Sequence, residues 1–101
     1  MRAHPDLDAI TCGSDQIGRG VCDRLRELGR TVPGDIAVTG FDNWEVMATA
    51  SRPPLTTMDL ELEELGRQAA QLLLEAISGA AHSGLVTLQP RLVTRESTLG
   101  T

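Results

Sequence analysis

Two short apolar runs, each closed by turn-forming residues, constrain the fold of this chain most strongly. Residues 7–12 end at Gly13, and residues 36–41, which are nearly continuously apolar and partly β-branched, end at Asp42. A short apolar run bounded by turn residues is typical of a buried strand. A nearly continuous apolar run is typical of a parallel strand that is covered on both faces. The sequence therefore predicts two strands of a parallel sheet.

The segment between these runs has the spacing of an amphipathic helix over residues 15–28. Ser14 and Asp15 offer side-chain oxygens that cap the free amides of a helix start, and Gly29 supplies the left-handed residue that commonly follows a helix end. The apolar positions recur at steps of four, four and three, at Ile17, Val21, Leu25 and Leu28. Strand, helix and strand form a βαβ unit with a right-handed crossover, so the predicted class is α/β.

The rest of the chain predicts one long helix and several short elements. A helix over residues 61–78 is capped by Asp59 and ended by Gly79. Residues 44–51 fit one or two helical turns, which the following prolines stop. The other expected elements are strands at 55–58, 85–88 and 91–94 and a loop at 80–84. The long helix carries one apolar stripe, formed by Leu62, Leu65, Ala69, Leu72, Leu73, Ala76 and Ile77.

Composition limits the classes of function. The 101 residues suffice for one small domain. Fourteen acidic residues face nine basic ones, all of them arginines, which gives a net charge of −5 without a basic cluster. Binding of nucleic acid by the chain itself is not expected, because neutralising phosphates requires a positive face. There is no apolar run of about 20 residues and no apolar N-terminal stretch, so no membrane span is expected and a cytoplasmic location is predicted.

The cysteines and histidines predict neither a metal site nor a disulfide framework. Cys12 and Cys22 fit two small buried hydrophobic residues. Only His4 and His82 could join them, and this spacing does not suit a four-ligand zinc site. The glycines do not form a dinucleotide loop, and no serine lies in a nucleophile elbow. We therefore predict no catalytic residue, no metal and no cofactor.

Polar residues follow both predicted strands, where ligands collect in open α/β sheets. Asp42 can hydrogen-bond to a ligand hydroxyl, Trp44 can stack on a sugar face, and Ser14 lies after the first strand. Ser14 and Asp15 can alternatively serve only to cap the helix. A further alternative is a receiver-like phosphate-handling domain with Asp42 as phospho-acceptor. That site needs more acids for Mg²⁺, and Asp15 is the only one available.

Several segments, in one order and spacing, resemble the C-terminal stretch of LacI/GalR-family bacterial transcription regulators. They extend from about residue 6 to residue 99 and lie at 8–10, 12–16, 30–43, 52–57, 64–66 and 92–98. They include the runs Val38-Thr39-Gly40-Phe41-Asp42-Asn43, Arg52-Pro53-Pro54-Leu55-Thr56-Thr57 and Thr94-Arg95-Glu96-Ser97-Thr98. The family resemblance rests on the combination of these segments, since each one alone is weak.

The resemblance implies a periplasmic-binding-protein-like (type I) sensor of two α/β subdomains with a small effector, a sugar or a nucleobase, between them. This chain would be the C-terminal portion of that effector-binding domain, with residues 1–58 and 90–101 in one subdomain and 59–89 in the other. Asp42 matches a strand-end aspartate that hydrogen-bonds effectors in several members, and Ser14 matches a position often held by a ligand-contacting asparagine. Leu60 and Leu62 match positions that contribute, in some members, to the effector cleft between the subdomains, and both are aliphatic here.

The resemblance also implies partners. Members of the family dimerise through the regions matching residues 16–28 and 45–52, so a homodimer is expected. DNA is contacted through a separate N-terminal helix-turn-helix headpiece, which these residues are expected to lack. In the family, strands upstream cover the apolar stripe of the 61–78 helix. In this chain alone, either the first sheet of the same chain or a second copy would cover it, and the dimerisation of the family favours the second copy. A periplasmic sugar-binding protein for transport remains an alternative, although residues 53–57 favour the regulators.

Overall fold

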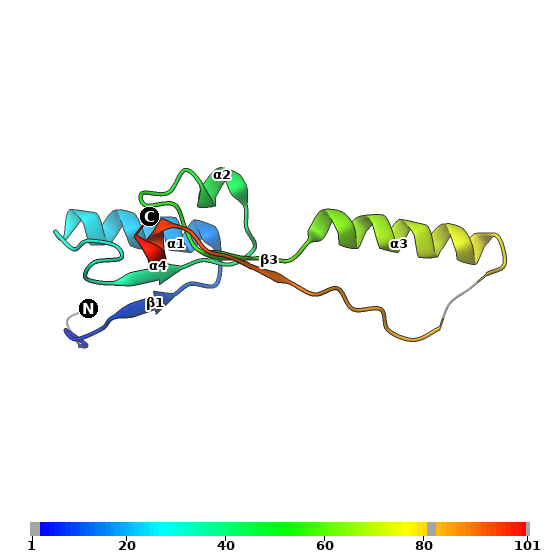
Figure 1. Ribbon diagram of the computed structural model, residues 1–101, viewed down its shortest axis with the longest axis horizontal. Coiled ribbons are helices and arrows are strands. Elements are labelled where there is room, and N and C mark those ends of the chain that lie inside the picture. Colours follow the sequence, from blue (N-terminus) through cyan, green and yellow to red (C-terminus); the bar gives the residue numbers. More distant parts are fainter. Residues whose placement is uncertain (1–2, 81–82, 101) are drawn as a thin grey trace. The chain divides into compact units, whose positions relative to one another are not determined.

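The computed structural model describes residues 3–80 and 83–100, and it divides into two compact units. The first unit comprises Met1–Asp59 and Leu92–Thr101, and the second comprises Leu60–Arg91. Figure 1 shows the elements in chain order, which are β1 (Ala9–Thr11), α1 (Asp15–Glu27), β2 (Ala37–Thr39), α2 (Glu45–Ala48), β3 (Thr57–Asp59), α3 (Leu62–Ile77), β4 (Arg91–Val93) and α4 (Glu96–Leu99).

The strands β1 and β2 pair in parallel, with α1 between them in sequence, which confirms the predicted α/β class. The register aligns Ala9 with Ala37, Ile10 with Val38 and Thr11 with Thr39. Gly40 N–H donates to the carbonyl of Thr56 at 2.8 Å, so the chain around β3 continues the sheet beside the end of β2. β3 pairs in turn with β4. The expected strands at 55–58 and 91–94 are therefore present, with slightly different bounds.

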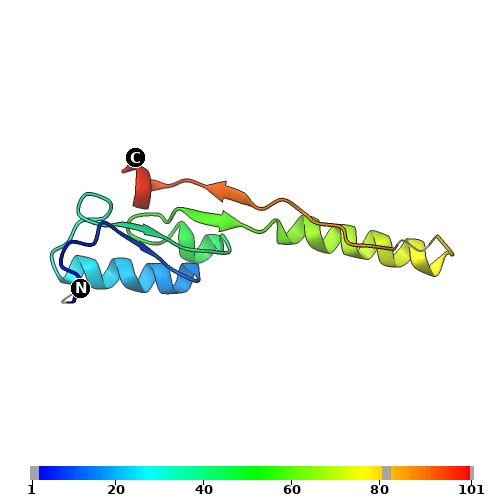
Figure 2. The same ribbon diagram turned by 90° about the horizontal axis from the view of Figure 1, so that it is seen from below.

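The core of the first unit forms where α1 packs on β2. Its buried apolar residues are Cys12, Cys22, Leu25, Ile36, Val38, Ala48 and Leu55. Figure 2 shows α1 and α4 on opposite sides of β2, so this strand is covered on both faces as its apolar sequence predicts. Burying each large aliphatic side chain contributes about 1.5–3 kcal/mol. The two cysteines are free and buried, as predicted.

The buried face of α1 differs from the predicted stripe. Ile17 and Leu28 are 57% and 48% exposed. The residues that α1 buries are instead Asp15, Gly18, Cys22 and Leu25, at steps of three, four and three. Gly18 allows close packing, because a Cβ there would lie 3.0 Å from a methyl carbon of Leu55. Of the predicted stripe, Leu25 is in the core and Val21 packs against it, so apolar periodicity found half of this face and missed Asp15, Gly18 and Cys22.

The C-terminal segment also departs from prediction. Residues 85–88 form no strand, because a strand needs a neighbouring backbone and none of the described residues pairs with them. Leu85 is 91% exposed. The short helix α4 was not predicted from the sequence. The hydroxyl of Ser97 attaches it to the sheet, donating to the carbonyl of Val38 at 2.6 Å and accepting from Thr56 N–H at 2.8 Å.

The second unit contains the long helix α3, at close to the predicted bounds. Its N-cap is Glu61, with a φ of 54°, and Asp59 is not the cap because it belongs to β3. Gly79 follows the helix with a φ of 98°, as expected of a helix-ending glycine. None of the residues of α3 is buried. Coverage of its apolar stripe by a second copy stays a prediction, and the expected loop at 80–84 lies partly outside the described residues.

The turn before β2 gives a pH-dependent contribution to stability. Thr31 donates to Oδ2 of Asp35 through its N–H at 2.8 Å and its hydroxyl at 3.0 Å, and these bonds, with a smaller effect from Arg30, lower the pKa of Asp35. A carboxyl with a lowered folded pKa stabilises the protein above its unfolded pKa, about 3.9, and this contribution is lost as the pH falls through the folded pKa. We expect Asp35→Asn to be less stable than the parent at pH 7, with a difference that shrinks below about pH 4. Urea unfolding across this range measures it, and a constant difference would contradict the expectation.

Candidate functional site

The carboxyl ends of β1 and β2 meet at one edge of the first unit. Ser14 follows β1, and residues 41–44 follow β2. Asp15 N–H donates to the carbonyl of Phe41 at 3.1 Å, which joins the two strand ends. The structure therefore brings Ser14 close to the loop that carries Asp42 and Trp44, at the edge where open α/β sheets bind ligands.

Asp15 fixes the geometry of this edge. It is 1% exposed, and its Oδ1 accepts from the hydroxyl of Thr57 while its Oδ2 accepts from Trp44 N–H, both at 2.6 Å. The expectation that Asp15 caps α1 is wrong. Ser14 is the cap, and its Oγ accepts from Ile17 N–H at 3.1 Å. Asp15 instead joins the start of α1, the loop after β2 and the start of β3.

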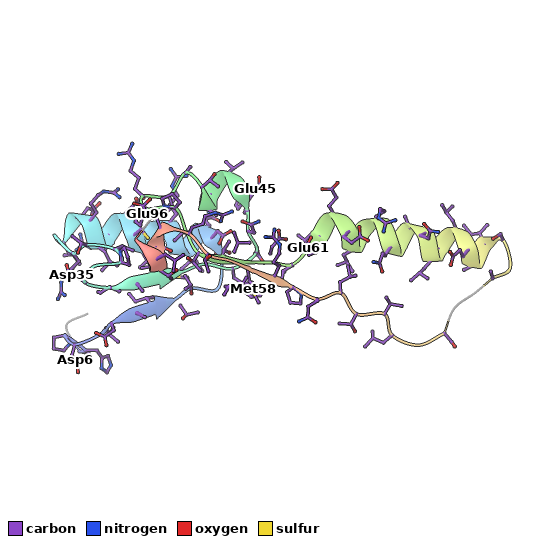
Figure 3. The ribbon with its side chains drawn as sticks, in the orientation of Figure 1. Asp6, Asp35, Glu45, Met58, Glu61 and Glu96 are labelled. Carbon is purple, nitrogen blue, oxygen red and sulfur yellow. The ribbon has the colours of Figure 1, made fainter. Side chains whose placement is uncertain are left out.

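The backbone of the loop after β2 is strained. Asp42 and Asn43 have φ values of 100° and 53°, in the left-handed region that side chains other than glycine rarely adopt. Asp42 N–H donates to the carbonyl of Met58 at 3.0 Å, and Met58 is labelled in Figure 3. Such conformations persist where surrounding contacts over-determine them, and they cluster at ligand-binding sites. The carboxyl of Asp42 is exposed and accepts no hydrogen bond from the residues that the structure describes.

Asn43 is the most connected residue of the loop, and the sequence placed it at the strand end without indicating its partners. Its N–H donates to the hydroxyl of Thr57 at 3.2 Å, and its Nδ2 donates to Oδ2 of Asp59 at 3.1 Å. Its Oδ1 accepts from a guanidinium N–H of Arg95 at 2.8 Å. The one available signal was its identity, because asparagine adopts the left-handed conformation more readily than most residues.

Two exposed aromatic residues flank Asp42 in the loop after β2. Trp44 is 51% exposed although its N–H is held by Asp15, and Phe41 is 40% exposed. An exposed aromatic side chain can stack on a sugar ring, and an exposed carboxyl in the same loop can accept from sugar hydroxyls. The other two predicted site residues, Leu60 and Leu62, belong to the second unit, where Leu60 is half-buried and Leu62 begins α3. Three of the five predicted site residues, Ser14, Asp42 and Trp44, therefore lie in the first unit.

The described residues offer little for metal or thiol chemistry. Across residues 3–80 and 83–100, no group of three or more histidine, cysteine or acidic side chains could hold a metal ion. Burial raises the pKa of the thiols of Cys12 and Cys22. The carboxyl of Asp15, the one further acid that a receiver-like site would use, is already bonded by Trp44 and Thr57. No helix of the described part of the chain is long and apolar enough to cross a membrane.

Known proteins match nearly the whole chain. The family model described as periplasmic binding protein-like domain matches residues 1–98. The HTH-type transcriptional regulator MalR of Streptomyces coelicolor is 41% identical over 95 residues, which cover 92% of this chain and 27% of that protein. The chain spans less than a third of the length of the curated relatives that it matches.

Solved structures of LacI-family regulators also match nearly the whole chain. A LacI-family transcriptional regulator from Arthrobacter sp. FB24, in complex with lactose, matches with a TM-score of 0.85 and 42% identity, over 96% of this chain and 37% of that one. A dimeric Lac repressor with a C-terminal deletion matches with a TM-score of 0.84 and 34% identity, over 91% of this chain and 34% of that one. The chain therefore belongs to the periplasmic binding protein-like domain family, in the form that LacI-family transcriptional regulators carry.

Proposed function

We propose that this chain is the C-terminal portion of the effector-binding domain of a LacI-family transcription regulator, and that its effector is a small hydroxylated molecule. A sugar is the first candidate and a nucleobase the second. The observation that carries the proposal is an exposed carboxyl, that of Asp42, on a strained loop beside the exposed Trp44. A related regulator that is 42% identical was solved with lactose, which supports a sugar.

Each site residue has a distinct chemical role in this proposal. Asp42 accepts hydrogen bonds from effector hydroxyls, and Trp44 stacks on the apolar face of a sugar ring. The hydroxyl of Ser14 already accepts from Ile17 N–H, so it remains able to donate its own hydrogen to an effector oxygen. For Leu60 and Leu62, an aliphatic contribution to effector binding stays a prediction from the family resemblance. No residue acts as a catalyst, and no metal or cofactor takes part.

The proposal includes the partners of the whole protein. Effector binding would shift the protein between two states with different affinity for an operator. DNA would be bound through a separate helix-turn-helix headpiece. This chain is acidic, with a net charge of −5, and its sequence lacks the basic cluster that would neutralise DNA phosphates. We propose a cytoplasmic homodimer, which the dimeric Lac repressor among the similar structures supports. The two compact units would be parts of the two subdomains of the sensor.

The decisive experiment is a thermal-shift screen of the full-length protein against monosaccharides, disaccharides and nucleobases, with inorganic phosphate as the control. A ligand that binds only the folded state raises the unfolding midpoint, and the rise grows with the ratio of the free ligand concentration to the dissociation constant. The hit is then added to an operator footprinting assay. We expect one sugar or nucleobase to raise the midpoint and to change operator protection. A sugar that binds without any protected DNA would favour a transport protein, and stabilisation by phosphate alone would favour the receiver-like class.

A further inference from the structure

Three chain segments meet at the side chain of Asn43. Its amide nitrogen donates to the carboxyl of Asp59, and its amide oxygen accepts from the guanidinium of Arg95. Asparagine suits this place because its amide presents a donor to the acid and an acceptor to the base at once. Arg95 is held in turn, since its other guanidinium nitrogen donates to the carbonyl of Leu55 at 3.0 Å and its N–H donates to the hydroxyl of Thr56 at 2.8 Å.

The partners of Asn43 lie where the chain passes between its two units. Asp59 ends β3 and is the last residue of the first unit before the second begins. The chain returns to the first unit at Leu92, within β4, and Arg95 follows three residues later. One side chain therefore holds both the outgoing and the returning segment. It also belongs to the loop of Asp42, whose φ of 100° requires such support.

We propose that Asn43 is a positioning residue that couples the loop of Asp42 to the two segments that connect the units. When the loop changes, the amide of Asn43 loosens or tightens its bonds to Asp59 and Arg95 together. The dependence is reciprocal, because a coupling free energy acts equally in both directions. That an effector drives this coupling rests on the proposed function. The coupling itself depends only on the hydrogen bonds of Asn43.

Hydrogen–deuterium exchange of the intact protein, followed by mass spectrometry, tests the coupling without any ligand. Asn43→Gly removes the amide and keeps the φ of 53° free of strain. We expect exchange to rise about tenfold in peptides covering 41–44, 57–59 and 91–95, as for an opening that has lost a hydrogen bond to a charged group. A rise confined to 41–44 would show a local role and overturn the proposal.

Asn43→Asp separates the two partners. The aspartate keeps an oxygen that accepts from Arg95, but it replaces the amide nitrogen that donates to Asp59 by a carboxylate oxygen that repels it. Exchange should therefore rise at 57–59 and not at 91–95. Equal rises at both segments would contradict the assignment of the two amide atoms. Asp35→Ala is the matched control, because it also removes two hydrogen bonds from the first unit, and its effect should remain within residues 30–36.

A second arm adds lactose or whichever sugar or nucleobase emerges from the thermal-shift screen. In the parent, binding should slow exchange at 41–44 and also at 57–59 and 91–95. In Asn43→Gly it should slow exchange at 41–44 only. Equal protection of all three segments in that variant would overturn the coupling. If no such ligand binds, the proposed function fails, while the ligand-free exchange pattern still decides the role of Asn43.

Discussion

Gly40→Ala is expected to destabilise the folded protein by about 3 kcal/mol or more, at or above the upper end of the usual cost of overpacking. A Cβ at position 40 would lie 2.2 Å from Oδ1 of Asp15 and 3.1 Å from its Cα. Neither atom can move away easily. The Cα belongs to the first turn of α1, and the carboxyl is bonded on both oxygens by Thr57 and Trp44.

Chemical unfolding of the intact protein measures this effect, and Gly20→Ala is its matched control. Gly20 lies within α1, and a Cβ there meets no atom within 4 Å. Alanine in an open helical position should stabilise the protein by about 0.5–1 kcal/mol. The same substitution should thus have opposite signs at two glycines. Equal or unmeasurable effects at both would contradict the packing described here.

Asp15→Ala is expected to destabilise the protein by about 3–5 kcal/mol. It leaves the buried hydroxyl of Thr57 and the part-buried N–H of Trp44 without their acceptors, and an unsatisfied group of this kind costs about 1–3 kcal/mol. Asp15→Asn should cost clearly less. Its amide oxygen can accept from Trp44 N–H while its amide nitrogen donates to Thr57, whose hydroxyl can also accept.

Equilibrium unfolding of both variants in the intact protein gives the order of their effects. The hydrogen-bond account predicts that alanine is worse than asparagine. If Asp15 only capped α1, as its sequence position first indicated, alanine would cost about 1 kcal/mol. An alanine effect of that size, or one no larger than that of asparagine, would refute the role of Asp15 as the junction of three segments.

The sequence predicts the elements of this fold well where local signals decide them. The run at 36–41 became the buried strand β2, and the helix between the strands begins after Ser14 and is followed by Gly29, which has a φ of 76°. These features depend on hydrophobic burial and on backbone conformations that act over a few residues. Long, capped segments are therefore predictable from one sequence.

Long-range polar contacts were not predictable. The sequence position of Asp15 indicated a helix cap, yet its carboxyl accepts a hydrogen bond from Thr57, 42 residues away. The side chain of Asn43 likewise accepts a hydrogen bond from Arg95, 52 residues away. No local pattern encodes such pairs. The strand expected at 85–88 was wrong for the related reason that strand formation requires a partner backbone, which apolar character alone does not supply.

The candidate site was predictable in part. The rule that ligands collect at the carboxyl ends of parallel strands selected Ser14, Asp42 and Trp44, and the structure gathers them at one edge. It could not indicate that Asp42 is strained, nor that Asn43 beside it is bonded on every polar group of its side chain. The roles of Leu60 and Leu62 stay predictions.

The most direct test of the central claim is a calorimetric titration of full-length Asp42→Gly with the sugar or nucleobase that stabilises the parent most. Glycine removes the carboxyl and relieves the strained φ of 100°, so the variant should be no less stable than the parent. The account predicts an affinity about 5- to 150-fold weaker, the effect of losing one or two ligand hydrogen bonds. An unchanged affinity in the folded variant would contradict the claim that Asp42 binds the effector.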